Sequence, residues 1–174
     1  MMIASITRLA AVALAAAALP AAAPVVAEAP SVPSATAARN KQIVTAAFDR
    51  WAASGSNIFE ELLSADVVWT IEGSGPSAGR FEGREAFVAR AVRPFVSRLS
   101  TPVRPVAKRI WADGDHVIAN WEGEGVARDG APYRNSYVWI FRMRDGKAVE
   151  VTAYLDLVPY DDVLRRVPAP VGRP

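Results

Sequence analysis

Residues 133–156 read Tyr133-Arg-Asn-Ser-Tyr-Val-Trp-Ile-Phe-Arg-Met-Arg-Asp-Gly-Lys-Ala-Val-Glu-Val-Thr-Ala-Tyr-Leu-Asp156. Two runs in which side chains alternate in character flank the pair Asp145-Gly146. An Asp-Gly pair between two such runs predicts a β-hairpin with a two-residue turn. The register of this hairpin then determines which side chains share a face of the sheet.

The predicted register places Arg144 opposite Lys147. The pairs that follow are Phe141 with Glu150, Trp139 with Thr152, Tyr137 with Tyr154, and Asn135 with Asp156. Because side chains alternate between the faces of a strand, these eight lie on one face. The other face carries Val138, Ile140, Val149, Val151, Ala153 and Leu155. An aromatic face that also holds an amide and a carboxylate is typical of a small-molecule pocket.

The next hairpin towards the N-terminus allows two registers. A two-residue loop at Asp129-Gly130 would turn Asn120, Glu122 and Glu124 towards the aromatic face, whereas a three-residue loop would turn Trp121 there. Two carboxylates in an enclosed pocket are costly, and this cost favours Trp121 on the inside.

The remaining pattern predicts helices before strands. Helical spacing or capping signals predict helices over 35–53, 57–63 and 84–99, and a helical turn over 160–166. Because Pro94 lies inside the third of these helices, we expect a kink or a break near Arg93. Strands are predicted over 67–71, 103–112, 116–127, 133–143 and 148–158, and a loop over 73–83. This order predicts an α+β fold in which a curved antiparallel sheet is wrapped by N-terminal helices.

The N-terminus predicts export. Arg8 precedes an apolar run over 9–19, and Val25-Val26-Ala27 places small residues where signal peptidase cleaves. The run is too short to span a membrane, so we expect a signal peptide over 1–27, cleavage after Ala27, and a periplasmic or secreted protein without membrane insertion. An uncleaved membrane anchor is the alternative. Residues 28–37 then form a flexible lead-in, 38–166 one domain, and 167–174 a disordered tail.

Composition excludes several classes of function. The chain has no cysteine, which excludes disulfides and cysteine-based zinc sites. Loss of Arg8 leaves the mature chain nearly neutral, so we expect no nucleic-acid partner. His116 is the only histidine, and no glycine-rich phosphate loop precedes a lysine. We therefore expect neither a metal nor a cofactor.

Three segments resemble the SnoaL-like branch of the NTF2-like superfamily, which has a cone-shaped α+β fold. They are Gly79-Arg-Phe-Glu-Gly-Arg-Glu-Ala-Phe87, Asp129-Gly-Ala-Pro-Tyr-Arg-Asn-Ser-Tyr-Val-Trp139 and Asp145-Gly-Lys-Ala-Val-Glu-Val-Thr-Ala-Tyr-Leu-Asp156. The resemblance covers about 38–166. It implies the cone, but because the fold hosts isomerases, cyclases, hydrolases and non-enzymatic binders, it does not set the reaction.

The resemblance also suggests roles for single residues. Asp156 matches an acidic residue that several family enzymes use as general acid or base, and Tyr137 or Tyr154 beside it resembles the oxyanion hole of ketosteroid isomerase. The positions that resemble the water-binding set of epoxide hydrolases hold Trp69, Ile71, Trp121 and Gly123, so that set is missing.

These observations lead to two functional hypotheses. The first is cofactor-independent acid-base catalysis on an apolar carbonyl or hydroxyl compound, with Asp156, Tyr137 and Asn135 as catalytic residues. The second is a non-catalytic periplasmic module that binds a small molecule or a protein. In both, the ligand contacts Trp69, Trp121, Trp139 and Tyr154.

We also expect a homodimer through the apolar face that carries Val138 and Ile140.

Overall fold

A computed structural model describes residues 34–170 of the chain. The predicted signal peptide, residues 28–33 of the lead-in and residues 171–174 lie outside this range. Within it, no helix has both the length and the hydropathy needed to cross a membrane.

The first two helices begin and end where the sequence predicts. In α1 (Ala35–Ser54), the N-cap Ser34 side chain accepts a hydrogen bond from the Ala37 N–H, and Gly55 ends the helix at φ 73°. Glycine suits this left-handed position because it has no Cβ. In α2 (Ile58–Leu62), the Asn57 side chain accepts from the Glu60 N–H. Both caps confirm the predicted boundaries to within a residue or two.

The third predicted helix is divided into α3 (Arg84–Phe87), the π-helical η1 (Val88–Val92) and α4 (Arg93–Val96). Pro94 has no N–H to donate to the Arg90 carbonyl, and in a regular α-helix its ring would collide with that carbonyl. The wider π turn directly before Pro94 removes this conflict. The predicted disturbance of the helix near Arg93 is therefore confirmed as a π-helical turn, whereas the chain does not break there, because Val92 and Arg93 both keep helical φ and ψ angles.

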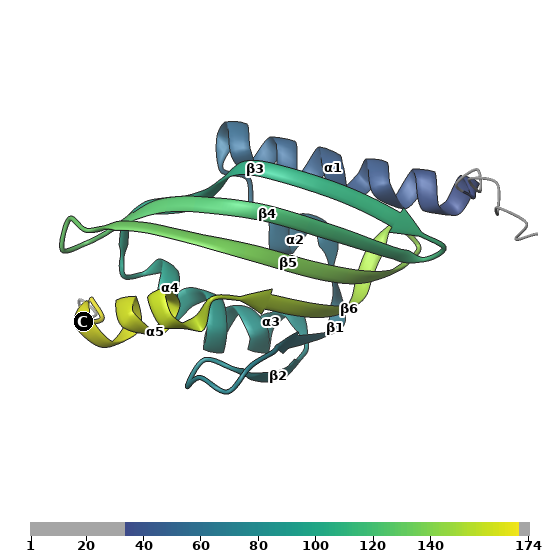
Figure 1. Ribbon diagram of the computed structural model, residues 1–174. Coiled ribbons are helices and arrows are strands. Elements are labelled where there is room, and N and C mark those ends of the chain that lie inside the picture. The colour runs from purple at the N-terminus through teal and green to yellow at the C-terminus, as the bar shows by residue number, and fades with distance from the viewer. Residues whose placement is uncertain (1–33, 171–174) are drawn as a thin grey trace, which may run out of the picture. The chain divides into compact units, whose positions relative to one another are not determined.

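Six strands form one sheet, shown in Figure 1. They are β1 (Leu63–Ile71), β2 (Gly79–Glu82), β3 (Leu99–Asp113), β4 (His116–Ala127), β5 (Pro132–Arg144) and β6 (Lys147–Leu155), followed by α5 (Leu157–Arg166). Their order is β2-β1-β6-β5-β4-β3. All neighbours are antiparallel except β1 and β6, which run parallel. The α+β prediction is confirmed, whereas the parallel pair and β2, which lies within the predicted loop, were not predicted.

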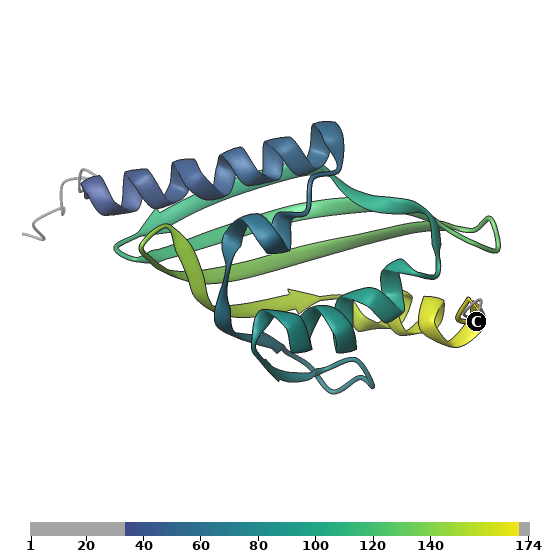
Figure 2. The same ribbon diagram turned by 180° about the vertical axis from the view of Figure 1, so that it is seen from behind.

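The helices from the N-terminal half cover one face of the sheet (Figure 2). Phe48 of α1 packs on this face with ring centroids 5.8 Å from both Trp121 of β4 and Trp139 of β5. All three side chains are buried. The core therefore lies between this helical layer and the concave face of the sheet.

A β-bulge changes the predicted register between β5 and β6. The Asp145-Gly146 turn is present, with both residues at positive φ and Arg144 opposite Lys147. Beyond Met143 and Ala148 the register shifts by one, because Val149 is an extra residue on β6. The predicted pairs further along the hairpin are therefore wrong.

The shifted register reverses the faces of β6. Phe141 lies opposite Val151, Trp139 opposite Ala153, and Tyr137 opposite Leu155. Val151 and Ala153 are buried, although the predicted register placed them on the outer face. Glu150 lies outside, where Arg142 donates to its carboxylate at 2.9 Å. The bulge thus exchanges a carboxylate for apolar side chains on the concave face.

The register between β4 and β5 agrees with the favoured prediction. The Ala127 N–H donates to the Ala131 carbonyl across a three-residue loop, and Trp121 lies opposite Tyr137. Trp121 is buried, while Glu122 and Glu124 are exposed.

The predicted disordered tail begins too early, because Val167 is buried and its carbonyl accepts from Arg98 Nε at 2.7 Å.

Candidate functional site: an aromatic pocket

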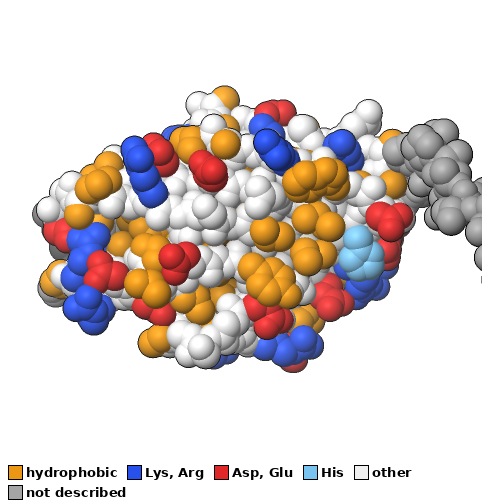
Figure 3. Space-filling model, viewed as in Figure 1, with side chains coloured by type: hydrophobic (Ala, Val, Ile, Leu, Met, Phe, Trp, Pro, Cys, Tyr) orange, Lys and Arg blue, Asp and Glu red, His pale blue; other side chains and the backbone are white. Residues whose placement is uncertain are grey.

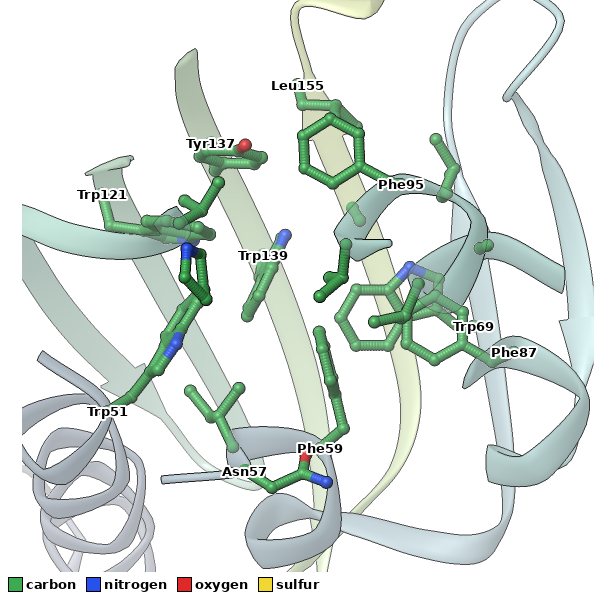
Figure 4. A pocket seen from close by; sticks show the side chains of 18 of the residues that line it. Trp51, Asn57, Phe59, Trp69, Phe87, Phe95, Trp121, Tyr137, Trp139 and Leu155 are labelled. Atoms are coloured by element: carbon green, nitrogen blue, oxygen red, sulfur yellow. The ribbon is translucent and has the colours of Figure 1, made fainter. Parts of the chain in front are cut away.

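A cavity of about 380 Å³ lies between the helices and the concave face of the sheet. Its aromatic lining residues are Trp51, Phe59, Trp69, Phe87, Phe95, Trp121, Tyr137, Trp139 and Tyr160. Most of the others are aliphatic, and none carries a charge. Figure 4 shows these rings converging from α1, α2, the α3–α4 segment and the strands. The lining can therefore hold an apolar molecule but offers it no ion pair.

Trp139 lies at the centre of the aromatic lining. On one side its ring meets Trp121 edge-on, and Trp121 stacks on Tyr137 with centroids 3.9 Å apart. On the other side it meets Trp69 edge-on, and Trp69 stacks on Phe87 at 4.1 Å. Offset and edge-to-face contacts are the favourable geometries for aromatic rings. The stacks hold the walls of the pocket in place.

Gly123 makes room for one of these stacks. A Cβ atom at this position would lie 2.7 Å from Trp121 Cζ3 and 3.1 Å from Tyr137 Cε2. Contacts this short are not tolerated between carbon atoms, so a larger residue would push the two rings apart. The absence of a side chain at Gly123 is therefore part of how the pocket is built.

The exposed lining residues mark the opening of the pocket. They are Gly55 and Asn57 in the turn between α1 and α2, Val96 of α4, and Pro102 of β3. The remaining lining lies deeper and is mostly buried. A ligand would therefore enter between this turn, α4 and the start of β3.

Of the ligand-contacting residues predicted from the sequence, Trp69, Trp121 and Trp139 line the pocket, and so does Tyr137. Tyr154 does not. It lies opposite Val138 on the outer face and is 47% exposed. The bulge at Val149 is the reason, because it turns Tyr154 away from the concave face.

The predicted cross-strand pair of Asn135 and Asp156 on the concave face is wrong, because the shifted register turns Asp156 away and the two residues meet only through the Asp156 backbone. Asn135 Nδ2 donates to the Asp156 carbonyl oxygen at 2.8 Å, and the Asp156 N–H donates to Asn135 Oδ1 at 3.1 Å. The Asp156 carboxylate caps α5 by accepting from the Val158 N–H at 2.9 Å. It is exposed and lies outside the pocket lining, whereas Asn135 is buried.

Tyr133 connects Asn135 to the pocket. Its hydroxyl accepts from Asn135 Nδ2 at 2.8 Å and shares a hydrogen bond of 2.8 Å with the Tyr137 hydroxyl. Burial raises the pKa of Tyr133 to about 12 and the pKa of Tyr137 well above its usual value. Both hydroxyls are therefore protonated near neutral pH.

Sequence reasoning missed several of these residues. Tyr133 was noted only as part of a strand, although it lies two residues before Asn135 on the same face. Trp51, Phe87 and Phe95 lie within the predicted helices, and the pattern of those helices did not indicate that they line a cavity. Tyr160 of α5 also lines the pocket, and its hydroxyl donates to the Ala91 carbonyl in η1 at 3.0 Å. Helical spacing shows which residues face inward, but not whether the helix encloses a core or a cavity.

Among residues 34–170, no group of three or more acidic or histidine side chains is placed to hold a metal ion. His116 lies at the start of β4, half-exposed, with its Nδ1 2.7 Å from an Asp115 carboxylate oxygen.

Comparison with solved structures supports the fold. A SnoaL-like polyketide cyclase candidate from Jannaschia sp. CCS1 has 19% identity and a TM-score of 0.60, covering 79% of this chain and 99% of its own. An NTF2-like protein from Burkholderia xenovorans LB400 has 19% identity and a TM-score of 0.56, covering 74% and 97%. TerC, co-crystallised with polyporic acid, has 21% identity and a TM-score of 0.57, covering 73% and 98%. At these identities the likeness concerns the fold alone.

No curated protein matches the sequence. The model of the SnoaL-like domain family matches residues 44–151, from the middle of α1 into β6. This range includes most of the strands and helices that enclose the pocket. The fold that the resemblance implied is thus confirmed, and the chain belongs to the SnoaL-like domain family.

Proposed function

We propose that this protein binds a small apolar molecule in the aromatic pocket. One observation carries the proposal: a cavity of about 380 Å³ is walled by aromatic and aliphatic side chains and has no charged residue in its lining. Pockets of this size with apolar walls and a few polar groups are the usual sites for small ligands. The co-crystal of TerC, a protein of the same fold, with polyporic acid agrees with such a role.

Binding is favoured over acid-base catalysis by the position of the carboxylates. A general acid or base has to come within hydrogen-bond reach of the reacting group. Asp156, the predicted proton-transfer residue, is exposed and caps α5. Glu150, which the predicted register would have turned inward, pairs with Arg142 outside. The polar side chains of the lining are hydroxyls, indoles and one amide, which donate or accept hydrogen bonds without exchanging protons at neutral pH.

The test uses N-phenyl-1-naphthylamine, an uncharged probe that becomes fluorescent in apolar sites. We expect saturable binding with one site per chain and quenching of the lining tryptophans. Val92→Trp fills the cavity from η1 and should abolish binding, whereas the matched control Val106→Trp, at a position 56% exposed on β3, should bind normally. Absence of saturable binding to the native protein, or unchanged binding to Val92→Trp, would refute the proposal.

We further propose that the protein acts outside the cytoplasm. Arg8, the apolar run over 9–19 and Val25-Val26-Ala27 form a cleavable signal in sequence. N-terminal sequencing of protein from the periplasmic fraction should then begin at Glu28. Intact Met1 on protein in the cytoplasmic fraction would contradict export.

We also propose a homodimer through the outer face of the sheet. The outer face carries a row of apolar side chains across β3, β4 and β5, formed by Trp111, Ile118 and Ile140. Next to this row, Val138 of β5 lies opposite Tyr154 of β6. Trp111, Ile118 and Tyr154 are 49%, 37% and 47% exposed. Figure 3 shows hydrophobic side chains grouped on this face. An apolar patch that crosses four strands is a feature of interaction surfaces.

Light scattering at micromolar concentration tests the dimer. The native protein should have twice the mass of one chain, and Ile118→Glu should be monomeric because it buries a charge in the interface. Val158→Glu, at a position 78% exposed on α5, is the control and should remain dimeric. A monomeric native protein would overturn this proposal but not the one on ligand binding.

A further inference from the structure

A positively charged side chain lies beside the opening of the aromatic pocket. Arg104 of β3 reaches the C-terminal end of α1, where its Nη1 donates to the Trp51 carbonyl at 3.0 Å. Its guanidinium lies against Gly55, so closely that a Cβ atom there would be 2.5 Å from Nη2. Gly55 is exposed and belongs to the lining at the opening. The charge that the lining lacks is therefore present directly next to it.

The contact with Trp51 uses only part of the Arg104 side chain. A guanidinium carries five N–H donors, and the Trp51 carbonyl is the hydrogen-bond partner that Arg104 has between residues 34 and 170. The same carbonyl accepts from the Gly55 N–H at 2.9 Å, so this contact helps to cap α1. The Nε and Nη2 protons of Arg104 are left for another acceptor.

The carboxylates around Arg104 are already paired with other cations. This holds for the acidic side chains of α1 and α2 and for the one opposite Arg104 in the sheet. The pairs are Asp49 with Lys108, Glu60 with Arg84, Glu61 with Arg50, and Glu124 with Arg134. Within the described part of the chain, Arg104 forms no ion pair, and its charge is uncompensated.

Asn57 supplies a second donor in the turn that contains Gly55. Its Oδ1 accepts from the Glu60 N–H and caps α2, which leaves Nδ2 as the free end of the amide. Asn57 is exposed and lines the pocket. Figure 4 shows it at the end of the cavity opposite Tyr137 and Leu155. An amide donor and a cation thus belong to the same side of the opening, whereas the walls further in are apolar.

We infer that the ligand carries a carboxylate on a short flexible arm, which Arg104 and Asn57 bind at the opening while an aromatic body fills the pocket. This inference rests on the proposed binding function, and it makes the apolar molecule an amphiphile. The planar guanidinium matches the two oxygens of a carboxylate. At the opening the carboxylate keeps part of its hydration, which it would lose without compensation inside the uncharged lining.

Two ligands of equal shape test the charge. These are 4-(2-naphthyl)butanoate and 4-(2-naphthyl)butanamide, of which only the first is charged at pH 7. Isothermal titration calorimetry gives both dissociation constants for the native protein, Arg104→Gln, Arg104→Lys and the control Arg109→Gln. Arg109 is exposed on the same strand, opposite Asn120 on the outer face, so the control removes an equal charge away from the opening. Comparing the ratio of the two constants between proteins cancels the cost of removing each ligand from water.

We expect the native protein to bind the acid about threefold or more tightly than the amide. Arg104→Gln should weaken binding of the acid by about fivefold or more and that of the amide by no more than about twofold, which also shows that the variant is folded. Arg104→Lys should retain part of the preference, because an ammonium keeps the charge but not the planar fork. Arg109→Gln should leave both constants unchanged. Raising the salt concentration from about 20 mM to about 500 mM should weaken binding of the acid alone.

The outcomes separate this inference from the proposed function. A native protein that binds the amide as tightly as the acid would overturn the inference, and this result does not depend on whether Arg104→Gln folds. Equal losses of acid binding in Arg104→Gln and Arg109→Gln would overturn the assignment to Arg104, because overall charge would then explain the preference. In both cases binding of the amide leaves the proposed function intact. If neither the amide nor the fluorescent probe binds the native protein, the proposed function itself fails.

Discussion

We expect the substitution Asn135→Leu to destabilise the protein strongly, although the two side chains have the same branched shape. The substitution keeps the branched shape and the number of heavy atoms of the side chain but removes three hydrogen bonds, two with the Asp156 backbone and one with the Tyr133 hydroxyl. Each net contribution is about 1 kcal/mol, and the groups left behind are partly or fully buried. We therefore expect the free energy of unfolding to fall by about 3 kcal/mol. For a domain of this length, that corresponds to a fall in Tm of roughly 10 °C.

The assay is urea unfolding followed by tryptophan fluorescence, supported by thermal unfolding followed by circular dichroism. Asn120→Leu is the matched control, because Asn120 is exposed on the outer face of β4. It should change stability by less than about 0.5 kcal/mol. A loss below about 1 kcal/mol for Asn135→Leu, or one equal to the control, would show that the amide does not join β5 to the start of α5 as argued.

Three further predictions concern the cap, the ring stack and the tyrosines. Asp156→Ala should cost about 1 kcal/mol in urea unfolding through loss of the α5 cap and leave probe binding unchanged, and weakened binding would contradict the structural role. Gly123→Ala should cost about 1–3 kcal/mol by separating Trp121 from Tyr137, and native stability would refute this. The pKa values of Tyr133, Tyr137 and Tyr160 are raised by burial, so the unfolded chain loses these protons first as pH rises. Stability should therefore fall as pH rises above about 10, seen as cooperative unfolding with phenolate absorbance, and a flat stability profile up to pH 12 would contradict it.

Local signals in the sequence predicted most of the secondary structure because each has a local physical cause. Asn57 caps α2 through its own side chain, and Pro94 disturbs its helix through its own ring. The Asp145-Gly146 pair adopts the positive φ angles that its turn requires. None of these effects depends on contacts distant in sequence, so the sequence was sufficient for them.

The pairing of β1 with β6 and the existence of β2 depend on distant contacts. Trp69 lies beside Val151 and opposite Phe81 only after the chain has folded around the helices. Hydrophobic patterning cannot distinguish a short edge strand such as β2 from a loop rich in Gly, Ser and Pro. Nothing local in the sequence indicates these two features.

The bulge at Val149 is a different case, because the energetic argument that predicts it was available. The cost of enclosing Glu122 and Glu124 correctly favoured Trp121 on the inside. The same cost applies to Glu150, which the simple two-residue turn would place beside Trp139 and Phe141. An extra residue at Val149 lets Glu150 pair with Arg142 outside and buries Val151. The predicted register followed the ideal geometry of a two-residue turn. In the structure the cost of burying the Glu150 carboxylate outweighs that geometry.

This single residue also determines what the pocket can do. Without the bulge, β6 would present Glu150 and Tyr154 to the cavity, and a general base would be at hand. With it, β6 contributes Ala153 and Leu155, and the polar atoms deep in the site come from indoles and hydroxyls whose protons are held tightly by burial. A site that donates hydrogen bonds but has no carboxylate to accept a proton agrees with the proposed binding of an apolar molecule. The register of one hairpin is therefore the feature on which the proposed binding function depends most directly.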